Sequence, residues 1–129
     1  MTDYLPKFPG RTETRTASSA VDGGQLVAVS AADTVAKTDG ATTAWLGVAA
    51  FLAGAGDRVT VHIGGTQRLV ASGSIGAGAQ VIPASEGRVA ALAVAAAGDA
   101  ADVNAARQIV GTAQEPGSDG DRIEVVMSR

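Results

Sequence analysis

The sequence predicts an all-β fold: a small barrel or sandwich of about eight or nine short antiparallel strands with an extended N-terminal arm. At five places a glycine stands two or three residues before a short run of branched apolar residues, as in Gly56-Asp57-Arg58-Val59. Glycine supplies the positive φ that tight turns require, and β-branched residues suit a pleated, half-buried surface. Apolar and polar residues also alternate cleanly from Arg58 to Ile63, and the segment from Arg122 to Met127 does much the same. Turns and strands therefore follow one another along nearly the whole chain.

The first segment, residues 1–18, is predicted to be the arm, and residues 19–129 the β-domain. Pro6 and Pro9 fix φ and favour extended backbone in the residues before them. The arm has no neighbouring segment on which to bury its large apolar side chains, which are Tyr4, Leu5 and Phe8. Two interpretations follow: the arm is unstructured, or it docks on a neighbouring subunit or another surface. Its apolar residues favour docking.

The body is expected to begin near residue 20. The predicted strands are Gln25–Val29, Thr34–Lys37, Ala44–Phe51, Arg58–Ile63, Gln67–Ala71, Gln80–Ile82, Arg88–Leu92, Gln108–Ala113 and Arg122–Met127. In the fourth of these, Val59, Val61 and Ile63 share one face, and the intervening residues Arg58, Thr60 and His62 share the other.

Gly64-Gly65 suggests a hairpin between two of these strands. A three-residue loop, Gly64 to Thr66, would pair Val61 with Leu69, whereas a two-residue loop would place Arg68 on the apolar face. A slip of one residue exchanges the faces of a strand, so the sequence predicts the three-residue loop.

The alanine-rich segment from Ala90 to Arg107 is ambiguous, because alanine favours helix while Gly98 and the flanking valines favour strand. We expect a strand to about Ala93, then an irregular or briefly helical stretch to Ala106. The run from Pro116 to Gly120 is predicted to be the turn before the last strand.

Composition restricts the class of protein. The chain has 129 residues, enough for one domain, but only four aromatic residues and no cysteine. Its core must be built from small aliphatic side chains, so self-association is a plausible source of further burial. A net charge of −3 argues against nucleic acid as the main partner. No apolar run reaches the length of a membrane span, and the N-terminus does not resemble a secretory signal.

No residue pattern points to catalysis, a metal or a cofactor. His62 is the only histidine and falls on the polar face of its strand, and no nucleophile signature surrounds any serine. The segment Ser72 to Gly78 is rich in glycine but lacks the features of a phosphate-binding loop, so it is interpreted as a strand connection. Asp119-Gly120-Asp121, with Glu124 beyond it, lacks the ligand spacing of a calcium loop. We therefore expect no enzyme; activity lost in His62→Ala would contradict this.

One alternative function remains, a β-barrel carrier or small-molecule binding module. Lys37 lies between apolar residues and a turn, as does the modified lysine at the hairpin tip of lipoyl- or biotin-carrying domains. The residues around it do not match the carrier motifs. A lysine adduct on Lys37 in the host-expressed protein would support this alternative.

Several segments together resemble the capsid decoration (head stabilisation, or cement) proteins of tailed bacteriophages, especially the small alanine- and glycine-rich ones from phages of actinobacteria. The segments that carry the resemblance are Thr14-Arg15-Thr16-Ala17-Ser18, Gly23-Gly24-Gln25-Leu26-Val27, Ala44-Trp45-Leu46-Gly47-Val48-Ala49, Gly56-Asp57-Arg58-Val59-Thr60-Val61, Gln67-Arg68-Leu69-Val70-Ala71-Ser72-Gly73, Val110-Gly111-Thr112-Ala113 and Ile123-Glu124-Val125. These are strand and turn signatures and contain no catalytic residue.

The resemblance implies a structural protein on the outer surface of the virion, bound to the major capsid protein and stabilising its lattice, often as a homotrimer. On this interpretation the arm contacts the capsid, and the expected contact residues are Tyr4, Leu5, Pro6, Phe8, Pro9 and Arg11. Trp45 lies either in the core or in the trimer seam; it begins an apolar strand, which favours the core.

Overall fold

The computed structural model of the chain describes residue 7, residues 10–92 and residues 108–128. Within these residues the fold consists of ten β-strands and a short 3₁₀ turn. The strands are Arg11–Ala17 (β1), Leu26–Ala31 (β2), Thr34–Lys37 (β3), Trp45–Ala49 (β4), Arg58–Ile63 (β5), Thr66–Val70 (β6), Gln80–Pro83 (β7), Val89–Ala91 (β8), Gly111–Ala113 (β9) and Arg122–Met127 (β10), and the 3₁₀ turn η1 is Ser85–Gly87. The all-β prediction is confirmed. No helix within the described ranges is long and apolar enough to cross a membrane.

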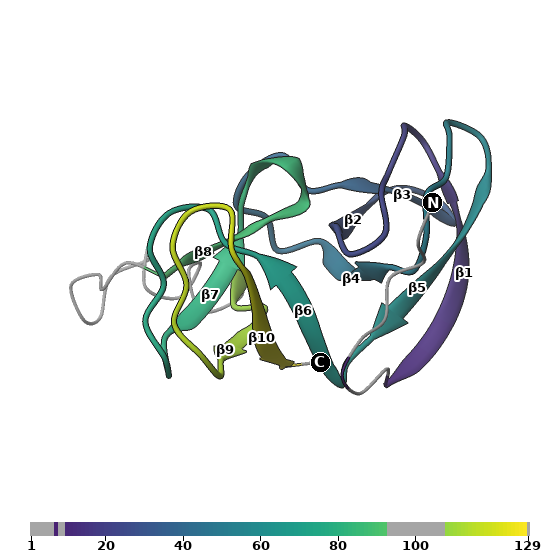
Figure 1. Cartoon of the computed structure of the whole chain (residues 1–129). Helices are drawn as coiled ribbons and strands as arrows, with labels where there is room; N and C mark the ends of the chain where they lie inside the picture. The colour runs from purple at the N-terminus through teal and green to yellow at the C-terminus, as the bar shows by residue number, and fades with distance from the viewer. Residues whose placement is uncertain (1–6, 8–9, 93–107, 129) are drawn as a thin grey trace.

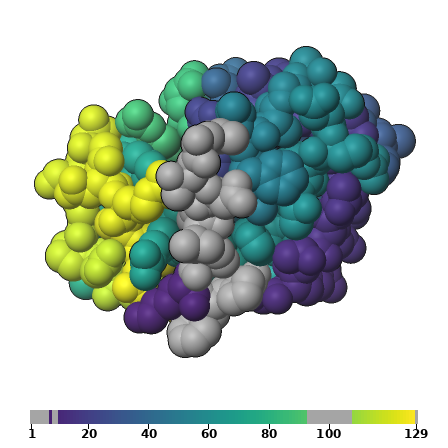
Figure 2. Space-filling view, turned by 45° about the vertical axis from the view of Figure 1, so that its right-hand side comes forward, coloured from purple at the N-terminus to yellow at the C-terminus, as the bar shows by residue number. Residues whose placement is uncertain are grey.

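The strands form two sheets that lie side by side (Figures 1 and 2). The first is a closed barrel of order β1-β3-β2-β4-β5, and the second has the order β6-β10-β9-β7-β8. Neighbouring strands are antiparallel except β1 and β3, which run parallel where Thr16 lies opposite Thr34 and Ala17 opposite Val35. That parallel contact closes the barrel, because β1 pairs with β5 along its other edge.

The two sheets are two copies of one topology. We call residues 11–63 the first half and the described residues from 66 to 128 the second half. The pairs β1–β5, β2–β3, β2–β4 and β4–β5 correspond to β6–β10, β7–β8, β7–β9 and β9–β10, all antiparallel. The parallel β1–β3 contact corresponds to a single parallel bridge between Ala71 and Val89. The second half therefore repeats the strand arrangement of the barrel as a five-stranded sheet, with a single bridge in place of the parallel strand pair.

Backbone hydrogen bonds recur at equivalent positions and fix the correspondence. Ala17 corresponds to Ala71, a shift of 54 residues, and Ala49 corresponds to Ala113, a shift of 64 residues. The matching bonds, from N–H to carbonyl, are Ala17–Asp57 and Ala71–Asp121 (2.8 and 2.7 Å), Ser18–Val35 and Ser72–Val89 (2.9 and 2.7 Å), and Gly24–Ala49 and Gly78–Ala113 (2.8 Å each). The shift changes from 54 to 64 residues because the connection from β8 to β9 has ten more residues than the connection from β3 to β4, counted between equivalent positions.

Two equivalent glycines show how close the strands of each half approach. A Cβ atom on Gly47 in β4 would overlap the carbonyl oxygen of His62 in β5. A Cβ atom on Gly111 in β9 would overlap the carbonyl oxygen of Val126 in β10. Glycine is required at both places because the backbone of the neighbouring strand occupies the space of a side chain.

The buried residues form two clusters, and one of them joins the halves. Val59 and Val61 belong to the cluster inside the first barrel. The other cluster fills the second half and also contains Leu26, Trp45 and Val48 of the first half. Trp45 is 1% exposed. It therefore lies in the core, as the sequence favoured, and it packs where the two halves meet.

The predicted hairpin at Gly64-Gly65 is wrong. Strand β5 pairs with β1 and β4, which leaves it no free edge, and β6 pairs with β10. Gly64 and Gly65 have φ values of 75° and 69°, so this glycine pair turns the chain out of the first barrel and into the second half. Alternation within β5 was predicted correctly, because Val59, Val61 and Ile63 are buried.

The division at residue 18 must be corrected. Residues 11–17, expected in the arm, form β1, which pairs with β5 from Arg11 opposite Ile63 to Thr16 opposite Arg58. The polar sequence of this segment suits a strand whose outward side chains face solvent. The alanine-rich segment of ambiguous structure lies mostly outside the described residues; β8 ends at Ala91.

Candidate functional site

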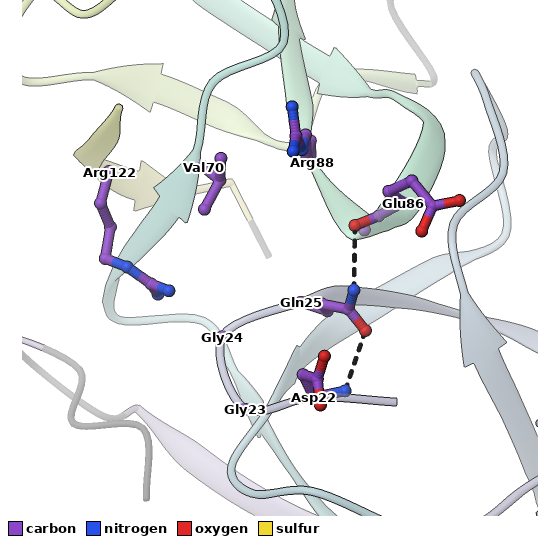
Figure 3. Close-up of a pocket in the computed structure, with 9 residues that line it drawn as sticks. Asp22, Gly23, Gly24, Gln25, Val70, Glu86, Arg88 and Arg122 are labelled. Carbon is purple, nitrogen blue, oxygen red and sulfur yellow. Dashed lines mark hydrogen bonds between the residues drawn. The ribbon is translucent and has the colours of Figure 1, made fainter. Parts of the chain in front are cut away.

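A cleft of about 250 Å³ lies where the two halves meet (Figure 3). The turn before β2 forms one wall, and the η1 turn with the adjoining ends of β6 and β10 forms the other. Its lining residues are Asp22, Gly23, Gly24, Gln25, Val70, Glu86, Gly87, Arg88 and Arg122. This volume is below the roughly 300–1,000 Å³ that is usual for cofactor sites, so the cleft suits a group the size of one side chain.

Gln25 joins the two walls of the cleft. Its amide oxygen accepts a hydrogen bond from the backbone N–H of Asp22 (2.9 Å), and its amide nitrogen donates to the carbonyl oxygen of Glu86 (3.1 Å) (Figure 3). A Cβ atom on Gly87 would lie 2.5 Å from the Cβ atom of Gln25, and Gly87 has a φ of 68°. The contact between the walls therefore requires glycine at position 87.

Three further bonds between the halves flank this junction. The Gly87 N–H donates to the carbonyl oxygen of Thr38 (3.0 Å), and the Thr38 hydroxyl donates to the carbonyl oxygen of Ala84 (2.7 Å). The Lys37 ammonium forms an ion pair with the Glu86 carboxylate (2.7 Å). This hydrogen-bonded pair raises the pKa of Lys37 and lowers the pKa of Glu86. The walls of the cleft are thus held by bonds on both sides of η1.

Two arginines, Arg88 and Arg122, and two carboxylates, Asp22 and Glu86, line the cleft. Arg122 reaches from the start of β10 toward the space between the walls, while the Glu86 carboxylate points away from it (Figure 3). Arg122 makes no ion pair with any described residue, and its Nη1 atom only approaches the carbonyl oxygen of Arg68 (3.4 Å). Among the described residues, Arg88 forms one ion pair, with the Asp119 carboxylate at 4.0 Å. Asp22 on the opposite wall forms no ion pair with either arginine.

The first half holds an equivalent arginine in a different setting. Arg58 begins β5 as Arg122 begins β10, and its Nη2 atom approaches the carbonyl oxygen of Thr14 at 3.4 Å. Its Nη1 atom donates to the Asp33 carboxylate and to the Thr16 hydroxyl, both at 2.9 Å. The hydrogen bond from Arg58 lowers the pKa of Asp33. Arg58 is therefore neutralised within its own half.

The arm residues predicted to contact a capsid are only partly described. Tyr4, Leu5, Pro6, Phe8 and Pro9 lie outside the described residues, and Arg11 is exposed at the start of β1. Between them, the ammonium group of Lys7 forms an ion pair with Glu124 of β10 (2.9 Å). Lys7 thereby lies against the second half beside Val126, which is 43% exposed.

Lys37 does not lie at a hairpin tip. The tip between β2 and β3 is formed by Ala32 and Asp33, and Lys37 ends β3, with its ammonium ion-paired to Glu86. This position differs from the one that suggested a carrier domain.

The structure also places the other residues that the sequence singled out. His62 is partly exposed on the polar face of β5, and burial lowers its pKa. Ser72 to Gly78 connects β6 to β7. In the acidic turn, the carboxylates of Asp119 and Asp121 accept hydrogen bonds from the backbone N–H groups of Gly73 and Ser118 (2.8 and 2.9 Å). No group of three or more metal-ligating side chains occurs in the described part of the chain.

Sequence reasoning missed the residues of the cleft, above all Arg122, Arg88 and Gln25. A signal for one of them was present, because Gly56-Asp57-Arg58 and Gly120-Asp121-Arg122 repeat the same three residues before two alternating strands. The repeat identifies Arg58 and Arg122 as equivalent. Their different surroundings depend on residues distant in sequence, such as Asp33 and Gly87.

Comparison with solved structures finds a similar fold. The chain is similar to the N base of head fiber protein gp8.5 of bacteriophage phi29, with a TM-score of 0.64 and 18% sequence identity, over 92% of this chain and 93% of that one. At this identity the likeness shows the fold. No protein-family model matches the chain, and no curated protein matches it.

Proposed function

We propose that this chain is a structural protein of a tailed-phage head, which binds the outer surface of the shell and stabilises the lattice of the major capsid protein. The observation that carries the proposal is the shared fold with a phage head fiber base over nine-tenths of both chains. The resemblance of the strand and turn segments to decoration proteins, drawn from the sequence alone, points to the same class.

The N-terminal arm is the proposed contact with the shell. Its apolar and proline residues are Tyr4, Leu5, Pro6, Phe8 and Pro9, and Arg11 follows where β1 begins. Prolines reduce the entropy that an extended segment loses when it is ordered on a partner. Many copies on one particle would make modest individual contacts collectively stabilising.

The oligomer proposed is a homotrimer. Val29, Leu52 and Val126 are exposed apolar side chains on the body, with 50%, 46% and 43% of their surface accessible. Analytical ultracentrifugation tests the proposal, with an expected mass of three times 12.7 kDa. A mass of 12.7 kDa at micromolar concentration would contradict the trimer.

The carrier alternative gains no support, because the Lys37 ammonium is engaged by Glu86. The shell-binding proposal is tested by co-sedimentation of the purified protein with phage heads from which it has been stripped. We expect saturable binding, weakened at least tenfold by the double substitution Tyr4→Ser with Phe8→Ser. Leu52→Ser, which removes an exposed apolar side chain from the body, is the control for the double substitution. Because Leu52 is also a candidate trimer contact, the mass of this variant is measured as well, and binding is compared only between samples of the same oligomeric state. Absence of binding by the unchanged protein would contradict the proposed function.

A further inference from the structure

We propose that the cleft between the halves receives an acidic side chain of the shell protein, held by Arg122 and Arg88. This inference deepens the proposed function and rests on it. It identifies a second contact with the shell, separate from the arm and polar in character.

The repeat itself shows which ligand this arginine geometry accepts. Arg58 and Arg122 begin equivalent strands and approach equivalent carbonyl oxygens, those of Thr14 and Arg68, at the same distance of 3.4 Å. In the first half the guanidinium also binds the Asp33 carboxylate at 2.9 Å. Asp33 lies in the turn between β2 and β3, so the natural ligand of this arginine position is a carboxylate on a turn.

The second half cannot supply that carboxylate from the equivalent position. Gly87 corresponds to Asp33, and both residues have positive φ, 68° and 54°. A side chain at position 87 would collide with Gln25, which ties the two walls together. The contact between the halves has therefore replaced the internal carboxylate, and Arg122 is left facing the cleft.

Two carboxylates line the cleft, those of Asp22 and Glu86, and neither forms an ion pair with Arg122 or Arg88. The neighbouring Glu86 carboxylate is bound to the Lys37 ammonium at 2.7 Å. Arg88, which forms an ion pair with the Asp119 carboxylate at 4.0 Å, adds a second guanidinium to the same wall. A guanidinium matches a carboxylate in geometry and charge, and such charge-assisted bonds are stronger than neutral ones.

A protein side chain fits the cleft better than a polyanion or a cofactor does. The volume of about 250 Å³ accommodates the end of one Asp or Glu side chain. The net charge of −3 disfavours approach of an extended polyanion such as nucleic acid. A loop of the shell that carries one acidic residue would place it where Asp33 lies in the first half.

The test compares the same substitution at the two equivalent arginines. Arg122→Gln is expected to weaken co-sedimentation with stripped heads about tenfold and to reduce its salt dependence. Arg58→Gln, which removes an arginine already neutralised by Asp33, is expected to leave head binding within about twofold of the unchanged protein. Arg122→Lys keeps the charge without the guanidinium fork and should be intermediate. Circular dichroism melting curves verify that each variant is folded.

Each outcome decides the matter. Binding by Arg122→Gln equal to that of the unchanged protein would overturn the cleft proposal and leave the proposed function intact. Loss of self-association by Arg122→Gln, with head binding preserved per trimer, would show that the carboxylate comes from a second copy and would overturn the assignment to the shell. Failure of the unchanged protein to bind heads would overturn the proposed function and this inference with it.

Discussion

The two halves of the molecule share one topology. They differ in how the sheet closes and in whether the arginine that begins the last strand forms an ion pair. The first half closes its barrel with two residue pairs and neutralises Arg58 with Asp33. The second half has one bridge there, between Ala71 and Val89, and no carboxylate of the described residues forms an ion pair with Arg122. The same backbone design thus serves as a self-contained barrel in one half. In the other it leaves Arg122 facing the cleft between the halves.

The difference begins at the junction between the halves. Strand β2 is buried on both faces at its start, because Val27 points into the first barrel and Leu26 packs with the second half. The equivalent of Leu26 is Gln80, which is exposed. Strand β2 therefore carries apolar residues on both faces, because the second half covers its outer face. Trp45 lies in the same shared cluster.

The largest effect is expected from removing that shared core. Trp45→Ala should lower the free energy of unfolding by about 3–5 kcal/mol, because it leaves a cavity where the halves meet. Trp45→Phe fills part of this space and should cost less. Urea denaturation followed by circular dichroism measures both. A loss below about 1 kcal/mol for Trp45→Ala would mean that the halves are stable without their shared cluster.

A smaller effect is expected at the turn that replaces the internal carboxylate. Gly87→Ala combines a positive φ with a collision against Gln25, whereas Gly120→Ala has a positive φ of 86° and open space around it. A left-handed conformation alone costs roughly 1–2 kcal/mol for a residue with a side chain. Gly87→Ala should therefore destabilise the protein by more than Gly120→Ala in thermal denaturation. Equal losses would contradict the close contact between Gln25 and Gly87.

The smallest effect is expected from the exposed pair that distinguishes the first half. Asp33→Asn preserves shape and tolerates the positive φ of 54° at this position. The pKa of Asp33 is held below its ordinary value of 3.8 by the hydrogen bond from Arg58. The stabilisation is therefore complete above pH 3.8 and is lost as the pH falls through the lowered value.

We thus expect the unchanged protein to be slightly more stable than Asp33→Asn at pH 7, with the difference disappearing in strong acid. Thermal denaturation at several pH values measures this. Two further variants complete a double-mutant cycle: the single substitution Arg58→Gln and the double substitution Asp33→Asn with Arg58→Gln. The cycle isolates the free energy of interaction between Asp33 and Arg58. A difference that does not change with pH would contradict an ionic origin.

Local chemistry made most of the strands predictable. Alternation in β5 and β10, and the glycines before β2, β5, β7 and β10, placed these strands within one residue of their observed starts. The polar segment Arg11–Ala17 was missed because it lacks an apolar face, although β5 pairs with it along its length. Tertiary pairing overrides propensity in such a strand.

Long-range arrangement could not be predicted. Gly64-Gly65 fits a hairpin locally, and only the occupancy of both edges of β5 excludes it. The cleft likewise depends on Gln25 reaching Glu86 across 61 residues of sequence. The repetition of Gly-Asp-Arg offered a local hint of two equivalent halves, and the change of shift from 54 to 64 residues obscured it.

The most direct test of the account is a high-resolution reconstruction of the heads of the phage that encodes this chain. The account predicts density for the barrel and the second sheet on the outer surface of the shell, with an Asp or Glu of the shell protein against Arg122 and with Arg58 still bound to Asp33. Density for this chain elsewhere in the particle, or on the shell with the cleft turned toward solvent, would contradict it.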